Sequence, residues 1–314
     1  MKVLASRGNP DIATVFVGMT RGRLVEFVES RQPPIPWDRK WVLILSVSFG
    51  CPVRCAICDA GGSFAGHLSA AEMLAQVEYL VARRFPDRDI PVGHFKIQFA
   101  RMGEPALNDE VLRAMDLIRG RLSAPGLMFC VSTIGPAGRE SFFDQLARVK
   151  DRFAGRFQLQ FSVHSTDGPE RDRLMPARKW SLERIAEYGR DLWNPGDRKI
   201  TLNFALHRSY EVSSARLADL FDPSRFLVKL TPVNPTDSAG AAQIETAFES
   251  DPDDCTSTLI EELRREGFEV RLSTGELEEN RIGSNCGQLV AQLSKTTAEI
   301  AQRSYGGSYS LGAL

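Results

Sequence analysis

The chain has 314 residues, of which 43% are hydrophobic and 25% are charged, and its formal net charge is −1. This is the composition of an ordinary soluble globular protein, and no run of Lys and Arg marks a nucleic-acid footprint. No apolar stretch is long enough to span a bilayer, and residues 1–7 lack the apolar core of a signal peptide. We therefore expect a cytoplasmic protein with no membrane segment, whose six cysteines are reduced and serve as ligands, nucleophiles or core residues.

The predicted elements begin with a hairpin and continue as alternating strands and helices. Residues 14–18 and 23–28 predict two strands around a turn, and the proline-rich residues 32–36 predict a stiff linker. Ser69-Ala70-Ala71-Glu72 is a capping box that begins the first helix. The later predicted strands are 42–47, 94–99, 127–132, 157–162, 200–205, 226–230 and 268–272, and the helices are 69–84, 109–121, 141–153, 182–193, 214–221, 256–266 and 289–302.

This alternation predicts an α/β fold with a parallel sheet. Six or so repeats are too few for a closed eight-stranded barrel, so a partial (βα)6 barrel and a doubly wound sheet both fit. Either fold places its chemistry at the carboxyl ends of the strands. We divide the chain into an N-terminal β-hairpin extension with its linker, residues 1–40, and a partial barrel with a C-terminal loop and helix, residues 41–314.

Polar and sulfur-bearing residues gather where the predicted strands end. Because parallel strands end at one edge of a sheet, these residues predict a single site at the mouth of the barrel. In chain order they are Cys51 to Cys58, Gly103 and Glu104, Ser132, Ser162 and His164, Asn234, and Cys286.

Cys51, Cys55 and Cys58 place three thiols within eight residues of one loop. Thiolates are the usual ligands of iron–sulfur clusters, and three of them leave one iron of a [4Fe–4S] cube open for a substrate. A structural zinc site needs four closed ligands, and the only local fourth candidate is His67. The spacing therefore favours the cluster over zinc or core thiols.

The spacing C-x3-C-x2-C resembles the motif of the radical S-adenosylmethionine (SAM) superfamily. The resemblance implies that the open iron binds SAM and that an electron from the cluster cleaves it to methionine and a 5′-deoxyadenosyl radical. The motif's penultimate residue, here Ile57, is often aromatic, and its backbone is placed to contact adenine. Gly103-Glu104-Pro105 resembles the loop that binds the SAM amino group, because an ammonium needs acceptors.

Further segments are similar to one subfamily, the radical SAM adenine methyltransferases of 23S rRNA and the related antibiotic-resistance methylase. The similarity covers residues 20–295 and includes Ser162-Val163-His164, Pro232-Val233-Asn234-Pro235 and Asn285-Cys286-Gly287-Gln288-Leu289. It implies that Cys286 is first methylated by SAM and then carries the methyl carbon to an electron-poor sp2 carbon of the substrate. It also implies SAM contacts from Ser132, Ser162, His164 and Asn234, and a proton acceptor at Glu26.

The sequence departs from this subfamily at several positions. Ile44 stands where the family has a second catalytic cysteine, which resolves the covalent adduct by a disulfide with the methyl-bearing cysteine. Cys130 and Cys255 are the candidate substitutes, although Cys130 lies in a predicted strand and favours a core role. Arg101 replaces a small residue, and either a substrate anion or a structural ion pair explains it. Only 50 residues precede Cys51, whereas the family usually has a helical RNA-contacting domain there.

These departures favour a radical SAM methyl- or methylene-transferring enzyme that acts on a small metabolite. A truncated RNA adenine methyltransferase is the alternative, and a non-catalytic metal-binding scaffold is a third reading. The expected partners are a small-molecule substrate and an electron donor such as flavodoxin or ferredoxin. RNA is the less favoured partner, and no membrane is expected.

Overall fold

The computed structural model describes residues 1–314 except 32, 250, 276, 285–287, 294–311 and 314. Its centre is one sheet in the order β10-β9-β8-β7-β6-β5-β4-β3-β2-β1-β11. The strands from β4 to β10 are parallel to one another. Their bounds are β4 (Lys40–Leu45), β5 (His94–Phe99), β6 (Leu127–Thr133), β7 (Phe157–Ser162), β8 (Ile200–Leu206), β9 (Phe226–Pro232) and β10 (Glu269–Leu272).

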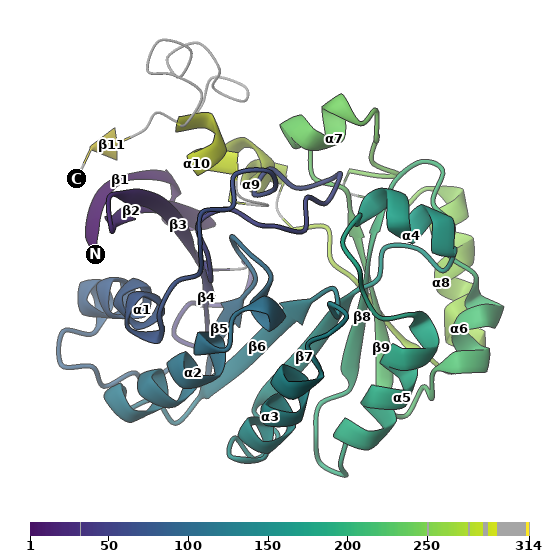
Figure 1. Ribbon diagram of the computed structural model, residues 1–314, viewed down its shortest axis with the longest axis horizontal. Helices are drawn as coiled ribbons and strands as arrows, with labels where there is room; N and C mark the ends of the chain where they lie inside the picture. The colour runs from purple at the N-terminus through teal and green to yellow at the C-terminus, as the bar shows by residue number, and fades with distance from the viewer. Residues whose placement is uncertain (32, 250, 276, 285–287, 294–311, 314) are drawn as a thin grey trace.

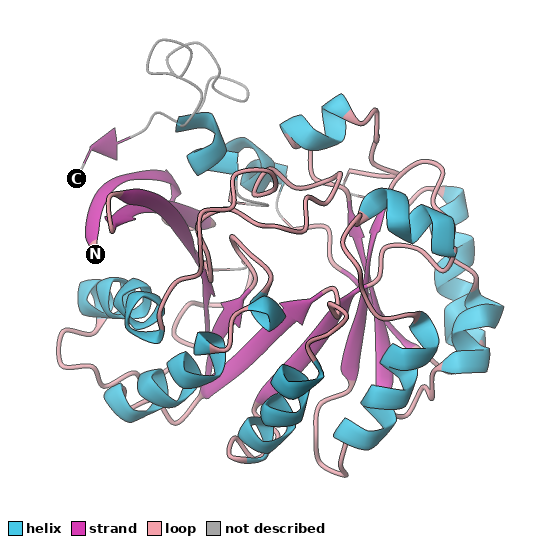
Figure 2. Cartoon of the chain, in the orientation of Figure 1, coloured by secondary structure: helices cyan, strands magenta, loops and turns pink. Residues whose placement is uncertain are grey.

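Helices follow the parallel strands and cover the outer face of the curved sheet (Figures 1 and 2). The long ones are amphipathic and begin at polar caps; Ser69 forms the predicted capping box with Glu72. The helices between β4 and β10 are α1 (Ala70–Arg84), the 3-10 helix η1 (Pro105–Leu107), α2 (Glu110–Arg121), α3 (Glu140–Asp151), α4 (Gly168–Leu174), α5 (Leu182–Leu192), α6 (Ser214–Leu220), α7 (Asp237–Ala241) and α8 (Asp254–Arg265).

The sheet continues beyond β4 as an antiparallel extension. It consists of β1 (Lys2–Asn9), β2 (Ala13–Thr20), β3 (Arg23–Ser30) and the short β11 (Gly312–Ala313). Two C-terminal helices, α9 (Leu277–Ile282) and α10 (Gln288–Leu293), lie over these strands (Figure 1). Arg7 ties the two ends of the chain together, since its Nε donates to the carbonyl of Ile282 over 2.7 Å.

Side chains alternate between the two faces of the parallel strands. In β5, Phe95, Ile97 and Phe99 are fully buried under the helices, whereas Lys96 and Gln98 point to the concave face. The same alternation in β7, β8 and β9 leaves polar residues on the concave face. The sheet therefore packs its apolar side against helices and exposes a polar hollow.

The predicted α/β class and parallel sheet are confirmed, and the strands from β5 to β9 lie within three residues of their predicted ends. The sequence analysis missed β1, η1, α4, α7, α9 and β11. The division at residue 40 remains a prediction, because β3 and β4 pair across it in one continuous sheet. Among the described residues, no helix is both long enough and apolar enough to cross a bilayer.

Candidate active site

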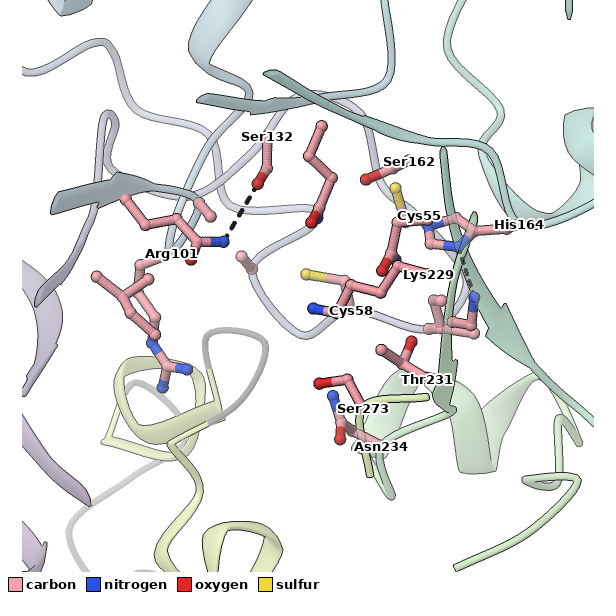
Figure 3. Close-up of a pocket in the computed structure, with 18 of the residues that line it drawn as sticks. Cys55, Cys58, Arg101, Ser132, Ser162, His164, Lys229, Thr231, Asn234 and Ser273 are labelled. Carbon is pink, nitrogen blue, oxygen red and sulfur yellow. Dashed lines mark hydrogen bonds between the residues drawn. The ribbon is translucent and has the colours of Figure 1, made fainter. Parts of the chain in front are cut away.

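A cavity of about 360 Å³ opens at the carboxyl ends of the parallel strands (Figure 3). Polar side chains from several strand ends and thiols from the loop after β4 meet there, as expected for a barrel of this kind. The residues predicted from the sequence that line it are Cys51, Cys55, Ile57, Cys58, Gly103, Glu104, Ser132, Ser162, His164 and Asn234.

The cysteine loop is held at both ends by neighbouring segments. Val47 N donates to the carbonyl of Met102 over 2.8 Å, and Leu68 N donates to the carbonyl of Val47 over 2.9 Å. The buried Asn108 side chain donates to the carbonyls of Val47 and Leu68 over 2.9 and 2.8 Å. The loop therefore leaves and re-enters the fold at a fixed position.

Cys51, Cys55 and Cys58 are half-buried and lie on the wall of one cavity. Burial raises the pKa of the Cys51 thiol to about 11, so a bound cationic centre is needed to hold it as a thiolate. Within the described residues, no three His, Cys, Asp or Glu side chains converge on a point where they could hold a metal ion. A structural zinc site needs four closed ligands, whereas three thiolates can each bind a different iron of a [4Fe–4S] cluster. The donor set therefore fits the cluster better than zinc.

The start of α7 packs on the cysteine loop, a contact that the sequence analysis did not predict. Thr236 Oγ1 donates to the carbonyl of Ile57 over 3.2 Å, and Ser238 Oγ donates to the carbonyl of Cys58 over 3.2 Å. Ser238 N also donates to Asp59 Oδ1 over 2.8 Å. A Thr at a helix N-cap was the available signal, but it does not identify a partner so distant in sequence.

Glu104 is buried at the edge of the cavity, and its carboxylate is held by the loop after β6. One oxygen accepts from Ala106 N over 3.0 Å and from Thr133 Oγ1, and the other accepts from Ile134 N over 3.0 Å. Burial outweighs these hydrogen bonds and raises the pKa of Glu104 to about 7. A ligand ammonium would favour the ionised form, which fits the predicted contact with the SAM amino group.

His164 presents one ring nitrogen to the cavity in a defined tautomer. Its Nδ1 accepts from the backbone N of Ala205 over 3.1 Å, so Nε2 carries the proton (Figure 3). Burial, with Arg171 and His207 nearby, lowers the pKa of His164 to about 4. The imidazole is therefore a neutral donor at physiological pH.

The other predicted SAM contacts lie on the same cavity wall. Ser132 Oγ accepts from Gln98 Nε2 over 3.2 Å, and Ser162 and Asn234 come from the ends of β7 and β9 (Figure 3). Ile57 packs with Ile134, which forms an apolar patch beside these polar groups. A polar rim beside an apolar patch suits a nucleoside ligand.

Glu26 is fully buried and does not line the cavity. Its Oε1 lies 2.7 Å from Nη2 of Arg101, and its Oε2 accepts from Val290 N over 2.8 Å. Arg101 lines the cavity and donates to the carbonyls of Gly283, over 2.8 Å, and Ser284. The ion pair thus joins β3, the Glu104 loop and the C-terminal segment; a proton-acceptor role for Glu26 remains a prediction. Cys286 lies outside the described residues.

Ile44, at the position of the family's second cysteine, lines the cavity. Cys130 is fully buried and does not line it, and Cys255 is exposed at the start of α8. The burial of Cys130 fits its predicted core role. Neither Cys130 nor Cys255 takes the place of the missing second cysteine on the cavity wall.

The sequence analysis missed a group of polar residues on the cavity wall beside the predicted SAM contacts. It consists of Gln98, Gln160, Asn203 and Lys229, each on the concave face of its strand. Strand alternation was the available signal, because each of these residues lies between fully or nearly fully buried apolar neighbours.

Comparisons with known proteins agree with this geometry. The chain is 32% identical over 266 residues to a "Probable dual-specificity RNA methyltransferase RlmN" of Desulfitobacterium hafniense, covering 82% of this chain and 69% of the relative. The chain belongs to the RlmN family of radical SAM methyltransferases. An RlmN relative of Deinococcus deserti is 29% identical over 278 residues, covering 86% and 75% of the two chains. No family model matches the chain.

Solved structures place the chain in the same group. A radical SAM methyltransferase from Sphaerobacter thermophilus has a TM-score of 0.69 and 25% identity, with 93% of this chain and 82% of that chain covered. Streptococcus suis SuiB bound to S-adenosylmethionine shares the fold, with a TM-score of 0.51 and 15% identity over 74% of this chain and 50% of that chain. This chain is therefore an enzyme of the radical SAM methyltransferase class, which uses a [4Fe–4S] cluster and SAM.

Proposed function

We propose that this enzyme methylates an sp2 carbon of an adenine base in RNA and that Cys286 carries the methyl group. The observation that carries the proposal is the 32% identity to an RNA methyltransferase over most of this chain. The curated relatives reported above are named for RNA rather than for the small metabolite that the sequence departures favoured.

The cavity wall holds SAM in this proposal. Glu104 accepts hydrogen bonds from the amino group, and the protonated Nε2 of His164 donates to a SAM oxygen or nitrogen. Cys51, Cys55 and Cys58 hold the cluster, which, when bound, supplies the electron that cleaves SAM. A flavodoxin or ferredoxin is the proposed source of that electron.

Cys286 acts as the methyl carrier. Its thiolate displaces the methyl group of one SAM, which forms a C–S bond and releases S-adenosylhomocysteine, and the thiol proton passes to a base. Ser284 and Val290, which flank residues 285–287 in the chain, are bound by Arg101 and Glu26.

Peptide mass spectrometry of the protein purified from cells tests this role. The proposal predicts one added methyl group on the peptide that contains Cys286 and none in Cys286→Ala. Cys55→Ala, which loses a cluster ligand, should lose iron and SAM cleavage. An unmodified Cys286, after anaerobic incubation of the iron-loaded enzyme with SAM, would remove the carrier role.

An RNA substrate is tested separately with isotope-labelled SAM. Transfer of label to the adenine of an RNA fragment supports RNA, and transfer to a free nucleotide but not to RNA supports the small-molecule alternative. One observation favours that alternative: Ile44 lies on the cavity wall where the family resolves its RNA adduct with a cysteine. Absence of label in both substrates would contradict both.

A further inference from the structure

Three polar residues form one row across the concave face of β8, β9 and β10. Asn203 is the register partner of Lys229, and Lys229 is the register partner of Arg271. Neighbouring strands lie about 4.8 Å apart, so the bases of these side chains are adjacent. Ser162 on β7 is the register partner of Asn203 and extends the row at the same level of the sheet.

Lys229 points into the hollow of the sheet. Its chain neighbours Val228 and Leu230 are fully buried under the helices, whereas Lys229 and Thr231 line the cavity (Figure 3). The apolar packing of β9 fixes this direction, because successive side chains in a strand point to opposite faces.

Further cations lie close enough to Lys229 to act on it, although they do not line the cavity. Lys40 at the start of β4, Lys96 in β5 and Arg271 in β10 all act electrostatically on Lys229. Burial, followed by these charges, lowers the pKa of Lys229 to about 8. In the part of the chain that the structure describes, no carboxylate forms an ion pair with Lys40, Lys96 or Lys229. Arg271 pairs with Glu269 on its own strand, over 2.7 Å.

This arrangement opposes folding stability. Like charges on adjacent strands repel one another, and a half-buried ammonium without a counter-ion loses part of its hydration. Sites that accept such a cost are commonly binding sites, where the ligand supplies the missing charge. A ligand anion in the hollow would relieve both costs at once.

The wall around Lys229 is equipped for a polar ligand. Gln98, Gln160 and Asn203 line the cavity, and Asn203 Oδ1 is buried without a hydrogen-bond partner. Amide groups both donate and accept, so they match the edge of a nucleobase, while Lys229 matches a phosphate. These amides and Lys229 together are therefore suited to bind a nucleotide.

We infer that Lys229, assisted by Lys96 and Arg271, binds a phosphate group of the nucleotide substrate on the concave face of the barrel. This inference rests on the proposed function, since a nucleotide is the substrate that the proposal assigns. The inference adds that the enzyme recognises a phosphate of this nucleotide and names the residues that bind it. The phosphate belongs either to an RNA chain or to a free nucleotide.

Equilibrium binding without turnover tests the inference. Adenosine, adenosine 5′-monophosphate and a short adenine-containing RNA hairpin are titrated into the iron-loaded enzyme, into Lys229→Gln and into Lys2→Gln, which alters an exposed lysine on β1. We expect Lys229→Gln to weaken binding of a phosphate-bearing probe about tenfold or more, because a charge-assisted hydrogen bond is lost. Adenosine and SAM should bind all three proteins alike.

The probes identify the source of the phosphate. A loss confined to the hairpin assigns the phosphate to RNA, and a loss with the monophosphate assigns it to a free or terminal nucleotide. Equal affinities of Lys229→Gln and the unaltered enzyme for both probes would overturn the inference, as would a loss of SAM affinity alone. Lys229→Arg, which keeps the charge, should retain phosphate binding and controls for misfolding.

The two proposals fail separately. Methylation of Cys286 needs SAM but no nucleotide, so Lys229→Gln should still acquire the methyl group. An enzyme that never methylates Cys286 yet loses phosphate binding in Lys229→Gln would refute the methyl-carrier function and leave the phosphate site in place.

Discussion

Arg101 forms a buried ion pair with Glu26, 75 positions earlier in the chain, with Nη2 and Oε1 2.7 Å apart and side-chain exposures of 2% and 0%. The same two side chains bind the backbone on both sides of residues 285–287, at Gly283, Ser284 and Val290. The ion pair thus links β3 and the loop after β5 to the described residues that flank 285–287. Of the two roles that the sequence left open for Arg101, the structure shows the ion pair.

Arg101→Met should destabilise the enzyme by about 3–5 kcal/mol, because it leaves the Glu26 carboxylate buried without its cation. The double variant Arg101→Met, Glu26→Met should recover much of that loss, since a buried pair contributes far less than an unpaired charge costs. Urea unfolding measures both. Arg184→Ala, which breaks an exposed pair with Glu187, is the control and should cost at most about 1 kcal/mol. A single variant no less stable than this control would contradict the assignment.

Gly103→Ala should destabilise the loop that contains Gly103 by about 2 kcal/mol or more, through backbone strain and steric overlap. Gly103 has φ +102°, and an added Cβ would overlap Ser48 Oγ and lie 2.8 Å from Val47 Cγ2. Gly62→Ala is a matched control, because Gly62 has φ +90° but nothing within 4 Å of the added carbon. Thermal unfolding and SAM affinity should both separate the two variants. Equal losses would mean that backbone strain alone explains the effect.

SAM affinity should increase as the pH rises toward 7. Burial raises the pKa of Glu104 to about 7, so the carboxyl is largely protonated at pH 6 and cannot accept from the SAM ammonium with full charge. The free energy of unfolding depends on pH in the opposite direction. A raised carboxyl pKa stabilises the folded state at low pH, and this contribution is lost as the pH rises through 7. Binding titrations between pH 5.5 and 7 would show up to about a tenfold change per unit. Glu104→Gln should bind more weakly with little pH dependence, and a similar slope in this variant would refute the assignment.

Ile44→Cys should place a second thiol on the cavity wall. If the family's chemistry operates here, this variant should form a disulfide with Cys286 after turnover, detectable by mass spectrometry without reduction, and should release product faster. The loss of buried apolar volume should cost about 1 kcal/mol. Ile44→Val, which brings no thiol, is the control, and Ile44→Cys that forms no disulfide during turnover would show that product release here does not need one.

Much of the architecture follows from local sequence. The 94–99 and 157–162 strands were predicted at their observed ends because period-two apolar patterns act over a few residues. Ser69 and Glu72 defined the start of α1 for the same reason, since both partners of a capping box lie within one turn. The spacing of Cys51, Cys55 and Cys58 likewise indicated a cluster, because the three ligands lie in one short loop.

Other features depended on how distant segments meet. The ion pair of Glu26 with Arg101 requires a particular placement of β3 beside the Glu104 loop, and the row from Asn203 to Arg271 requires the register of three strands. Period-two patterns predict which face a residue occupies but not its neighbour on the next strand, because register is set by the packing of the whole sheet. The sequence by itself therefore determined the elements, the cysteine loop and the edge of the sheet that carries the site. Only the tertiary structure decided which charges face one another across it.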